Sequence, residues 1–366
     1  MLIAIDNGFQ SCILAPTEIL ANQHFKSLSE LIIDYDVKVD LLTGSSKTRE
    51  RNLIHSNLLS GKTNILVGTH AILEDVVKFK NLGLSIIDEQ HRFGVAQRAK
   101  LWKKNNPAPH ILVMTATPIP RTLAMSLYGD LDISYIKELP PGRITTKTVH
   151  KFDRNRLSVF KFLKDQINKG RQVYLVYPLI NESEKLDYKD LMDGYESIVR
   201  EFPRPDLQVS IVHGKMKAKD KDYEMKRFIN QETQILVSTS VFEVGVNVPN
   251  SAVMVIESAE RFGLSQLHQL RGRVGRGNDE SYCVLMTKDK LSEDSKLRIE
   301  TMVKVSDGFK LAEVDLKLRG PGDMLGTRQS GMLRFKLADI VYDTEILNNA
   351  RNSATVSYTH LRAHET

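Results

Sequence analysis

The sequence predicts an α/β protein with two doubly wound parallel sheets in tandem, followed by a small helical element. Short apolar segments alternate with helical segments along most of the chain, which is the pattern of β-α-β units. In the first half, each apolar segment ends in a small or polar cluster, where such a sheet places its working residues. The alternation stops at residues 138–143, which contain two prolines and a glycine, and then restarts, so the chain divides into two units.

Length and composition are those of a globular protein with two domains and room for a third small element. Hydrophobic residues make up 41% of the 366 residues and charged residues 26%, which is ordinary. Lys and Arg outnumber Asp and Glu by 51 to 45, a net charge of +6 that is compatible with a nucleic-acid partner but weak evidence for one. There is no apolar run of about 18 residues and no signal-peptide pattern, so we expect a cytoplasmic protein without membrane contact.

The two cysteines, Cys12 and Cys283, are far apart in the sequence and lie inside apolar runs. We expect them to be reduced thiols in the protein core. The ten histidines show no His-x-x-x-His spacing and the cysteines no Cys-x-x-Cys spacing, so a metalloenzyme is not favoured.

Residues 1–138 are expected to form the first α/β unit. Met1–Asp6 indicates the end of a helix with Asn7-Gly8 as its stop signal, so we expect the chain to be part of something longer. Strands are expected at 10–15, 37–42, 64–68, 84–87 and 110–114, with helices at 16–32 and 49–59.

A linker at 139–147 leads to the second unit, expected at 148–290. Its strands are expected at 148–152, 172–176, 208–212, 234–238, 252–256 and 281–286, with helices at 156–169, 188–202, 219–230 and 265–271. Residues 291–350 are expected to form a helical element, which begins with a charged helix at 293–305 and continues through a glycine-punctuated stretch at 318–331. Residues 351–366 are expected to be a disordered or foreign tail.

The strongest candidate for chemistry is Asp88-Glu89-Gln90-His91, which follows the apolar run 82–87. An unpaired buried charge is costly, so two adjacent acids after a buried strand fit best at the carboxyl edge of a parallel sheet. There one carboxylate can hold Mg²⁺ through water while the next orients or deprotonates the water that attacks a phosphate. A bare Asp-Glu pair is more often a solvated strand end, so the rest of the chain has to support this interpretation.

That support comes from His268-Gln269-Leu270-Arg271-Gly272-Arg273-Val274-Gly275-Arg276 in the second unit. Guanidinium groups match phosphate oxygens, and an arginine delivered to a γ-phosphate stabilises the charge of phosphoryl transfer. Such a cluster alone could equally be a solvated basic turn. Together with Asp88 and Glu89 it predicts an ATP site between the two units, whose opening and closing would couple hydrolysis to movement.

At this point the chain resembles a known family. Asp88-Glu89-Gln90-His91 and Gln269-x-x-Gly272-Arg273-x-Gly275-Arg276 resemble motifs II and VI of superfamily 2 helicases. Further segments fit in order, and together they resemble the RecG-type branched-DNA helicases, whose sheets are RecA-like: Ala15–Glu18, Gly68–His70, Phe93–Arg98, Thr115–Pro118, Ile119–Thr122, Val237–Pro249, Glu260–Gly263 and Arg319–Gly331. The resemblance runs from Met1 to about residue 352.

The resemblance implies roles at the nucleotide. Asp88 would hold Mg²⁺ through water and Glu89 would position the attacking water. Arg273 and Arg276 would contact the γ-phosphate, and other nucleotide contacts would come from Gln269, Gly245 and Asn247. Coupling of the ATP site to DNA would involve Gln90, His91, Thr115 and Thr117.

The resemblance also implies contacts with DNA. Hydroxyl and imidazole groups at Thr17, Thr69, His70, Thr239 and Ser240 would contact the backbone of one strand without reading bases. The stretch from Arg319 to Gly331 resembles the family's translocation motif, a helical hairpin and loop acting on duplex DNA. Within it the candidates are Arg319, Arg328 and Gln329, although a glycine-rich surface turn is the alternative. The partner would be forked or otherwise branched DNA, bound by a monomer, and the full-length parent could also contact a single-strand-binding protein.

Two features depart from the family pattern. Asn247 stands where the family usually has an aspartate, which removes a charge from the nucleotide or coupling site. No Gly-x-x-x-x-Gly-Lys-Ser/Thr sequence occurs; Gly61-Lys62-Thr63 imitates its end but has Ser56 in place of the first glycine and precedes a strand, and Ser45-Ser46-Lys47-Thr48 also fails. In the family this loop lies just upstream of the helix at Met1, and a fork-binding wedge domain lies further upstream.

We therefore expect the motor portion of a RecG-type, ATP-dependent helicase of recombination and DNA-damage repair, with little ATP hydrolysis by the chain as given. Two alternatives stay open. A transcription-repair coupling translocase shares the motor and the translocation motif. A non-catalytic DNA-binding remnant would bind ATP weakly and DNA in a salt-sensitive way.

Overall fold

The structure, a computed structural model, divides into two compact units, residues 1–117 and 118–366. The residues that it describes are 1–90, 93–116, 134–136, 138, 143–178, 184–202, 207–239, 248, 250–275, 279–324, 343, 346, 349–350 and 353–354. The unit boundary falls among residues outside these ranges, so the expected linker at 139–147 stays a prediction. Each unit is described by itself.

Unit 1 is a five-stranded parallel sheet, sheet A, with strand order β2-β3-β1-β4-β5. Its strands and helices are α1 (Leu2–Asp6), β1 (Gln10–Leu14), α2 (Glu18–Leu31), β2 (Val39–Leu42), α3 (Thr48–Ser60), β3 (Ile65–Gly68), the 3₁₀ helix η1 (His70–Leu73), β4 (Leu82–Ile87), α4 (Val95–Trp102) and β5 (His110–Val113).

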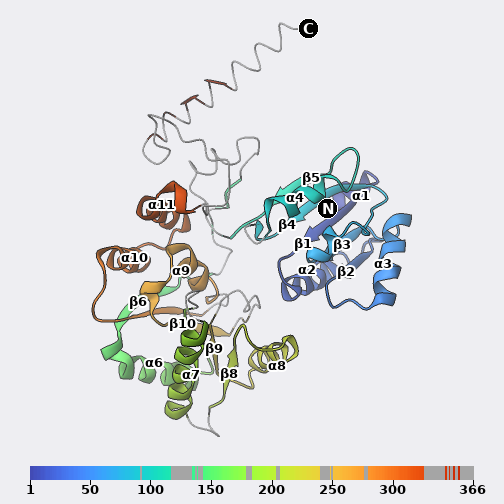
Figure 1. Ribbon diagram of the computed structural model, residues 1–366. Coiled ribbons are helices and arrows are strands. Elements are labelled where there is room, and N and C mark those ends of the chain that lie inside the picture. The colour runs from blue at the N-terminus through green and yellow to red at the C-terminus, as the bar shows by residue number, and fades with distance from the viewer. Residues whose placement is uncertain are drawn as a thin grey trace. The chain divides into compact units, whose positions relative to one another are not determined.

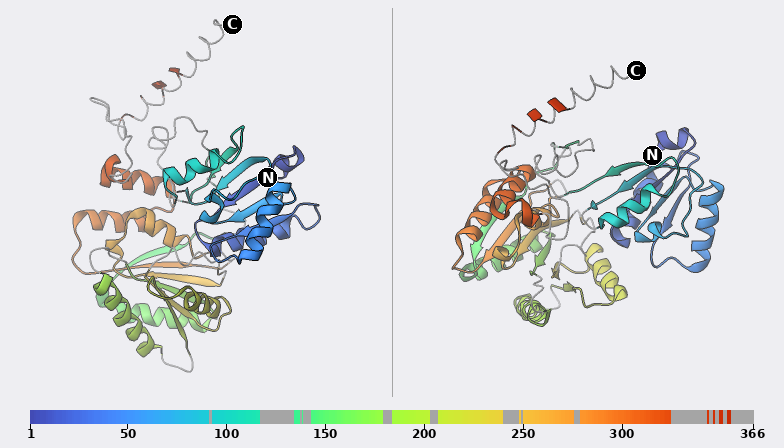
Figure 2. Two further views of the ribbon diagram at one scale, coloured as in Figure 1. Left: turned by 45° about the vertical axis from the view of Figure 1, so that its right-hand side comes forward. Right: turned by 45° about the horizontal axis from the view of Figure 1, so that its top comes forward.

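Helices cover both faces of sheet A (Figures 1 and 2). On one face, strand residues such as Cys12 and Leu66 pack with Leu58 of α3 and Leu101 of α4. On the other face, Ile13 and its neighbours pack with α1 and α2. The alternation of strand side chains between the two faces produces these two cores.

Unit 2 contains a six-stranded parallel sheet, sheet B, with strand order β6-β11-β10-β7-β9-β8. Its elements are β6 (Lys147–Phe152), η3 (Asp153–Asn155), α6 (Arg156–Asn168), β7 (Gln172–Val176), α7 (Glu184–Glu201), β8 (Val209–Val212), α8 (Ala218–Ile229), β9 (Ile235–Ser238), β10 (Ser251–Ile256), η5 (Ala259–Arg261), α9 (Leu264–Arg271), β11 (Tyr282–Thr287), α10 (Glu293–Lys304) and α11 (Gly308–Met324).

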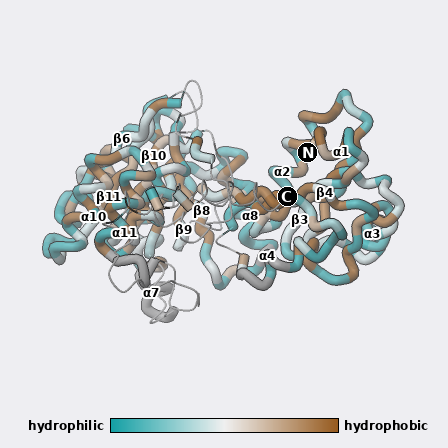
Figure 3. The backbone as a smooth tube through the Cα atoms, turned by 90° about the horizontal axis from the view of Figure 1, so that it is seen from above, coloured by the Kyte–Doolittle hydropathy of each residue, from teal (hydrophilic) through white to brown (hydrophobic). Residues whose placement is uncertain are grey.

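Sheet B is also covered on both faces. One core joins the sheet to α6 and α7, and the other joins it to α8, α9, α10 and the first part of α11. Hydrophobic and hydrophilic stretches alternate along the backbone of both units, as amphipathic elements require (Figure 3). The terminal helices α10 and α11 are thus part of the core of unit 2.

The predicted fold class is confirmed, because both units are doubly wound parallel sheets and a helical part follows. All eleven predicted strands are present, with ends within two residues of the expected positions. Both cysteines are free and fully buried, and burial raises the pKa of Cys12 to about 11 and that of Cys283 to about 12. Among the described residues no helix is long and apolar enough to cross a membrane.

Candidate active site

The predicted site residues of unit 1 follow the carboxyl ends of the strands of sheet A. Because all five strands are parallel, these ends lie at one edge of the sheet. The residues that follow the strand ends are Thr17 after β1, Thr43 after β2, Thr69 after β3, Asp88 after β4 and Thr115 after β5. The sheet therefore brings together side chains that are up to 98 positions apart in the sequence, from Thr17 to Thr115.

Asp88 is fixed at this edge by two hydrogen bonds. Its backbone N–H donates to the carbonyl oxygen of Leu14, at the end of β1, over 2.9 Å. Its carboxylate oxygen Oδ2 lies 2.9 Å from Nε2 of His24 on α2, and the side chains are 21% and 29% exposed. The carboxylate is thus held on one side and accessible to solvent, as a water-mediated cation site requires.

Glu89 has backbone φ of +50°, in the left-handed region that non-glycine residues rarely adopt. Its carboxylate oxygen Oε2 accepts a 3.4 Å hydrogen bond from the N–H of Ala116. The next residue, Gln90, is buried, and its N–H donates to the carbonyl oxygen of Met114 beyond β5. His91 lies outside the described residues.

Thr17 is the N-cap of α2, since its hydroxyl oxygen accepts a hydrogen bond from the N–H of Leu20. Its own hydroxyl proton can still be donated to a phosphate. His70 and Thr115 are exposed, whereas Thr69 is only 2% exposed. The Thr69 hydroxyl has no hydrogen-bond partner among the described residues, and it could reach a DNA phosphate only if its loop moved. Thr117 lies outside the described residues.

The two sequences that imitate a phosphate loop have other functions. Gly61 ends α3 with φ of +81°, and the hydroxyl of Thr63 donates to Asp40. The loop before α3 does follow a strand, but its polar groups bond within the protein: Ser45 donates to Glu18 through both its N–H and its hydroxyl. Neither segment has the Gly-x-x-x-x-Gly-Lys-Ser/Thr pattern of a phosphate loop.

In unit 2, the arginine cluster begins within α9 and continues beyond it. Arg271 is only 6% exposed, and its guanidinium donates to the carbonyl oxygens of Met302, Val305 and Ser306 at 2.9–3.0 Å. It therefore holds the end of α10. Arg273 follows the helix and is half-buried, as is Gln269, and Arg276 lies outside the described residues.

The structural role of Arg271 was not anticipated, although a signal for it exists. Leu264, Leu267, Leu270 and Val274 are all fully buried, at helical spacing, and Arg271 shares their face of α9. His268 lies beside it, with Nδ1 3.2 Å from the Arg271 guanidinium. Burial, and then the Arg271 charge, lower the pKa of His268 from 6.5 to about 4.

The carboxyl edge of sheet B holds an ion pair that the sequence did not reveal. Arg156, at the start of α6, donates to both carboxylate oxygens of Glu257, over 2.6 and 2.8 Å. The Glu257 side chain is 5% exposed and follows β10 directly. The bidentate geometry and burial leave this carboxylate no free oxygen for a cation.

The remaining predicted residues of unit 2 are placed in part. Thr239 is 4% exposed, and its hydroxyl has no partner among the described residues. The backbone of Arg319 lies in α11, which continues as a helix through Gly320-Pro321-Gly322 to Met324. The predicted residues outside the described ranges are Ser240, Gly245, Asn247, Arg328 and Gln329.

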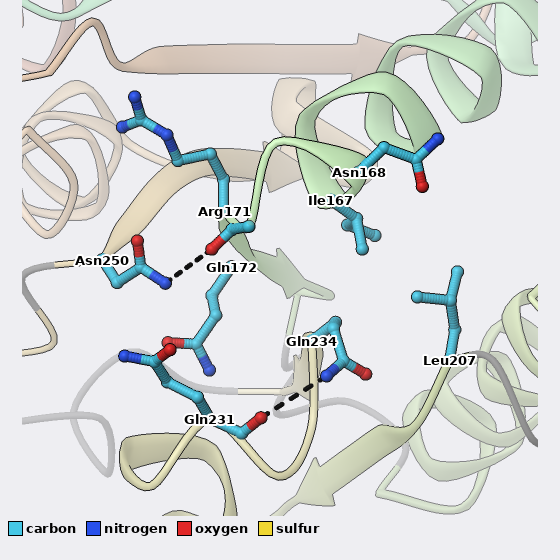
Figure 4. A pocket seen from close by; sticks show the side chains of 9 residues that line it. Ile167, Asn168, Arg171, Gln172, Leu207, Gln231, Gln234 and Asn250 are labelled. Carbon is cyan, nitrogen blue, oxygen red and sulfur yellow. Dashed lines mark hydrogen bonds between the residues drawn. The ribbon is translucent and has the colours of Figure 1, made fainter.

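A pocket of about 300 Å³ lies at the opposite, amino edge of sheet B (Figure 4). Side-chain amides dominate its wall, and Asn250 donates to the carbonyl oxygen of Gly170 over 2.8 Å. None of the predicted site residues lines it, so the pocket is separate from the candidate site.

The residues present fit a hydrated Mg²⁺ better than a metal enclosed by protein ligands. Within the described residues, no group of three His, Cys, Asp or Glu side chains could hold a metal. Mg²⁺ commonly keeps several waters and binds through one or two carboxylates together with substrate phosphates. Asp88 offers one half-exposed carboxylate, which suits that mode of binding.

Comparison with known families agrees with this architecture. A model described as DEAD/DEAH box helicase matches residues 1–126, and one described as helicase conserved C-terminal domain matches 158–278. A third, for domain 3 of the ATP-dependent DNA helicase RecG, matches 305–361. The two parallel sheets and these matches place the chain in the class of helicase motors with tandem RecA-like domains.

Individual relatives identify the family within this class of helicase motors. The ATP-dependent DNA helicase RecG of Synechocystis sp. is 50% identical over 354 residues, covering 97% of this chain and 42% of that protein. RecG of Bacillus subtilis is 50% identical over 351 residues, covering 96% of this chain and 51% of that protein. The chain belongs to the RecG family, and it spans about half the length of the curated relatives it matches.

Solved structures agree. A structure of RecG bound to a three-way DNA junction is 41% identical, with a TM-score of 0.74, and covers 93% of this chain and 44% of that chain. The DUF1998 helicase MrfA bound to DNA is 16% identical with a TM-score of 0.62, which shows a shared fold alone. The resemblance predicted from the motifs is therefore confirmed.

Proposed function

We propose that this chain is the motor portion of a RecG-type enzyme that uses ATP to remodel branched DNA, such as stalled forks and Holliday junctions, in recombination and repair. The observation that carries the proposal is the 41% identity to a RecG that was solved bound to a three-way junction, over 93% of this chain. The enzyme would act as a monomer in the cytoplasm, and its full-length form could contact a single-strand-binding protein.

At the nucleotide, Asp88 holds a hydrated Mg²⁺ in this proposal, and the ion neutralises charge on the phosphates of ATP. Glu89 orients the attacking water and accepts its proton. Gln90, His91, Thr115 and Thr117 couple the site to DNA in this proposal.

The second unit supplies the positive charge in this proposal. Arg273 and Arg276 contact the γ-phosphate and stabilise the charge that develops during transfer. Gln269, Gly245 and Asn247 complete the nucleotide contacts. Arg271 is excluded from this role, because its guanidinium is engaged with the backbone carbonyls of Met302 in α10 and of Val305 and Ser306 just after it.

DNA contacts come from the exposed residues of the carboxyl edge and from the terminal element. Thr17 and His70 are accessible for phosphate contact, whereas Thr69 and Thr239 need movement of their loops. Ser240, Arg319, Arg328 and Gln329 are the further proposed contacts. All of these groups suit backbone positioning more than base readout.

The test is equilibrium binding of this chain to a fluorescent three-way junction and to linear duplex of equal length, across a salt series. We expect binding to both DNAs with a linear loss of log affinity with log salt concentration. Absence of salt-sensitive binding to either DNA would contradict the proposal, whereas a preference for the junction is not required of the motor portion, because the resemblance places fork recognition in a domain further upstream.

ATP hydrolysis separates the catalytic proposal from a DNA-binding role alone. The chain contains no Gly-x-x-x-x-Gly-Lys-Ser/Thr sequence, so we expect it to hydrolyse ATP poorly even with forked DNA. DNA-stimulated turnover comparable to that of an intact helicase would contradict this expectation. DNA binding without any affinity for ATP would favour the non-catalytic alternative.

A further inference from the structure

His24 contacts the acid that is central to the proposed reaction. Its Nε2 lies 2.9 Å from Oδ2 of Asp88, although the two residues are 64 positions apart. Its helix, α2, is anchored by the Thr17 cap and by Ala21, which is fully buried one turn before His24. The histidine is therefore presented to Asp88 by a fixed element of the fold.

The direction of this hydrogen bond follows from the chemistry of the partners. An ionised carboxylate can only accept, so the proton of the bond is on Nε2 of the imidazole. A single N–H then holds Oδ2 and fixes the rotation of the carboxylate. Within the described residues the Asp88 side chain makes no other hydrogen bond or ion pair. Its second oxygen, Oδ1, is therefore left for a hydrated cation.

In unit 2 the acid that follows the matching strand is paired with an arginine instead of a histidine. Glu257 follows β10 as Asp88 follows β4, but the Arg156 guanidinium occupies both of its oxygens and the carboxylate is 5% exposed. An imidazole gives one bond and a guanidinium gives two. Only the imidazole orients the acid and also leaves it able to bind a cation.

We propose that His24 is a positioning residue for the metal site: it orients the Asp88 carboxylate so that the free oxygen faces the hydrated Mg²⁺. The inference rests on the proposed function, in which Asp88 holds that ion. Partners in the outer shell of metal ligands commonly change metal affinity about 10–100-fold when they are removed.

The experiment uses Mn²⁺ alone as a paramagnetic probe in place of Mg²⁺, since both prefer carboxylate and water ligands. Broadening of backbone amide signals near Asp88 is followed as Mn²⁺ is added to the 366-residue chain. We expect His24→Leu to weaken Mn²⁺ binding about tenfold. His24→Gln should restore most of the affinity, because its amide N–H₂ can donate from a similar reach.

Two further variants give the experiment its controls. Asp88→Asn should abolish the broadening. His110→Leu removes an exposed histidine at the opposite edge of the sheet, on β5, and should leave Mn²⁺ binding unchanged. Hydrogen exchange of α2 in each variant reports whether the helix is still folded.

A second readout does not depend on metal. Nitrogen-15 NMR of the His24 ring should show the proton on Nε2 in the wild-type chain. A ring protonated only on Nδ1 would overturn the positioning role.

The outcomes separate the two proposals. If Asp88→Asn leaves Mn²⁺ binding unchanged, the metal role of Asp88 fails, and the inference about His24 fails with it. If Asp88→Asn abolishes binding but His24→Leu does not weaken it, only the positioning role of His24 fails. A loss in His24→Leu that His24→Gln does not restore also contradicts the hydrogen bond as the cause.

Discussion

The five strands of sheet A and five of the six strands of sheet B follow the same spatial order. The order is β2-β3-β1-β4-β5 in sheet A and β8-β9-β7-β10-β11 in sheet B, where β6 is added at the edge beside β11. In both, an acid follows the fourth strand in this order, and its N–H donates over 2.9 Å to the end of the neighbouring strand, Asp88 to Leu14 and Glu257 to Val176. The residue after each acid is left-handed, with φ of +50° at Glu89 and +47° at Ser258.

The acids that follow the matching strands therefore have the same backbone geometry but different partners and different exposure to solvent. The Asp88 side chain is 21% exposed and accepts one hydrogen bond from a histidine, whereas Glu257 is buried in a bidentate ion pair with Arg156. A solvent-accessible carboxylate with a free oxygen can serve as a cation ligand, whereas a buried carboxylate with both oxygens in an ion pair can only stabilise the fold. The difference supports the proposed cation site at Asp88, whereas Glu257 at the matching position of unit 2 has a structural role.

The largest expected effect on stability comes from the buried ion pair of Glu257 with Arg156. Arg156→Ala leaves the Glu257 carboxylate buried without its partner, and we expect unit 2 to lose about 3 kcal/mol of unfolding free energy. His24→Ala should cost unit 1 less than about 1 kcal/mol, because both members of that pair are partly exposed. Urea unfolding followed by hydrogen exchange in β10 and β4 measures the two separately.

Arg154 provides the matched control for that prediction. It pairs with Asp289 at 3.5 Å, and both side chains are more than half exposed, so Arg154→Ala should leave the stability nearly unchanged. Equal losses in the Arg154 and Arg156 variants would mean that the burial of Glu257 is not the cause.

A second difference lies where the third and ninth strands end. A Cβ added at Gly68 would lie 2.0 Å from the carbonyl oxygen of Leu42, whereas unit 2 has a serine, Ser238, at the matching position. Gly68→Ser should destabilise unit 1 by about 2 kcal/mol, because the backbone of β2 has to shift. The reverse change, Ser238→Gly, should cost unit 2 about 0.5–1 kcal/mol through chain entropy.

Hydrogen exchange in β2 and β8 checks this pair of variants. If Gly68→Ser costs no more than Ser238→Gly, the close approach to Leu42 has no energetic consequence and the two sheets are interchangeable at this position.

A third difference is the partly buried imidazole of His268 in unit 2. Burial, and then the Arg271 charge, hold the pKa of His268 at about 4, below its ordinary 6.5, against the opposing charge of Asp307. Between pH 6.5 and 4 the unfolded chain therefore binds more protons at His268 than the folded chain does. The contribution of neutral His268 to the unfolding free energy is fully present above pH 6.5 and is lost as the pH falls toward 4. We expect a loss on the order of 1–2 kcal/mol, confined to unit 2.

His268→Gln isolates the titration, since its side chain can accept from Arg271 but does not ionise in this range. Urea midpoints of the wild type and the variant, compared from pH 7 to pH 4, should diverge as the wild type loses stability. Parallel curves would exclude His268 as the source.

The sequence predicted the strands well because each is a short apolar run that ends in a small or polar cluster. It did not predict α4, whose signals are weak: Gly94 at its N-cap has no side chain, and Gln97 bonds back to the Gly94 N–H. It also left the glycine-punctuated stretch from residue 318 without a helix of its own, whereas α11 continues through Gly320-Pro321-Gly322. Packing of Leu311 and Leu316 in unit 2 outweighs local propensity there.

At the site, the sequence indicated the acids and the arginines but not their partners. Asp88 and Glu89 stand out because they follow an apolar run. The contacts of Asp88 with His24 and of Glu257 with Arg156 span 64 and 101 positions, and no local pattern encodes them. Arg271 could be told apart from Arg273 only by its position on the buried face of α9.

The smallest expected effect concerns helix caps, which differ from helix to helix. Thr17 caps α2 with its hydroxyl, while α3 and α8 both begin after a lysine without a side-chain cap. Thr17→Ala should cost unit 1 about 1 kcal/mol, and Thr17→Ser should cost little because serine caps as well. The same pair tests the proposed DNA contact: if junction binding falls in Thr17→Ala while α2 still protects its amides from exchange, the hydroxyl contacts DNA directly. If binding falls only where α2 loses that protection, Thr17 acts through the helix and presents His24 to Asp88.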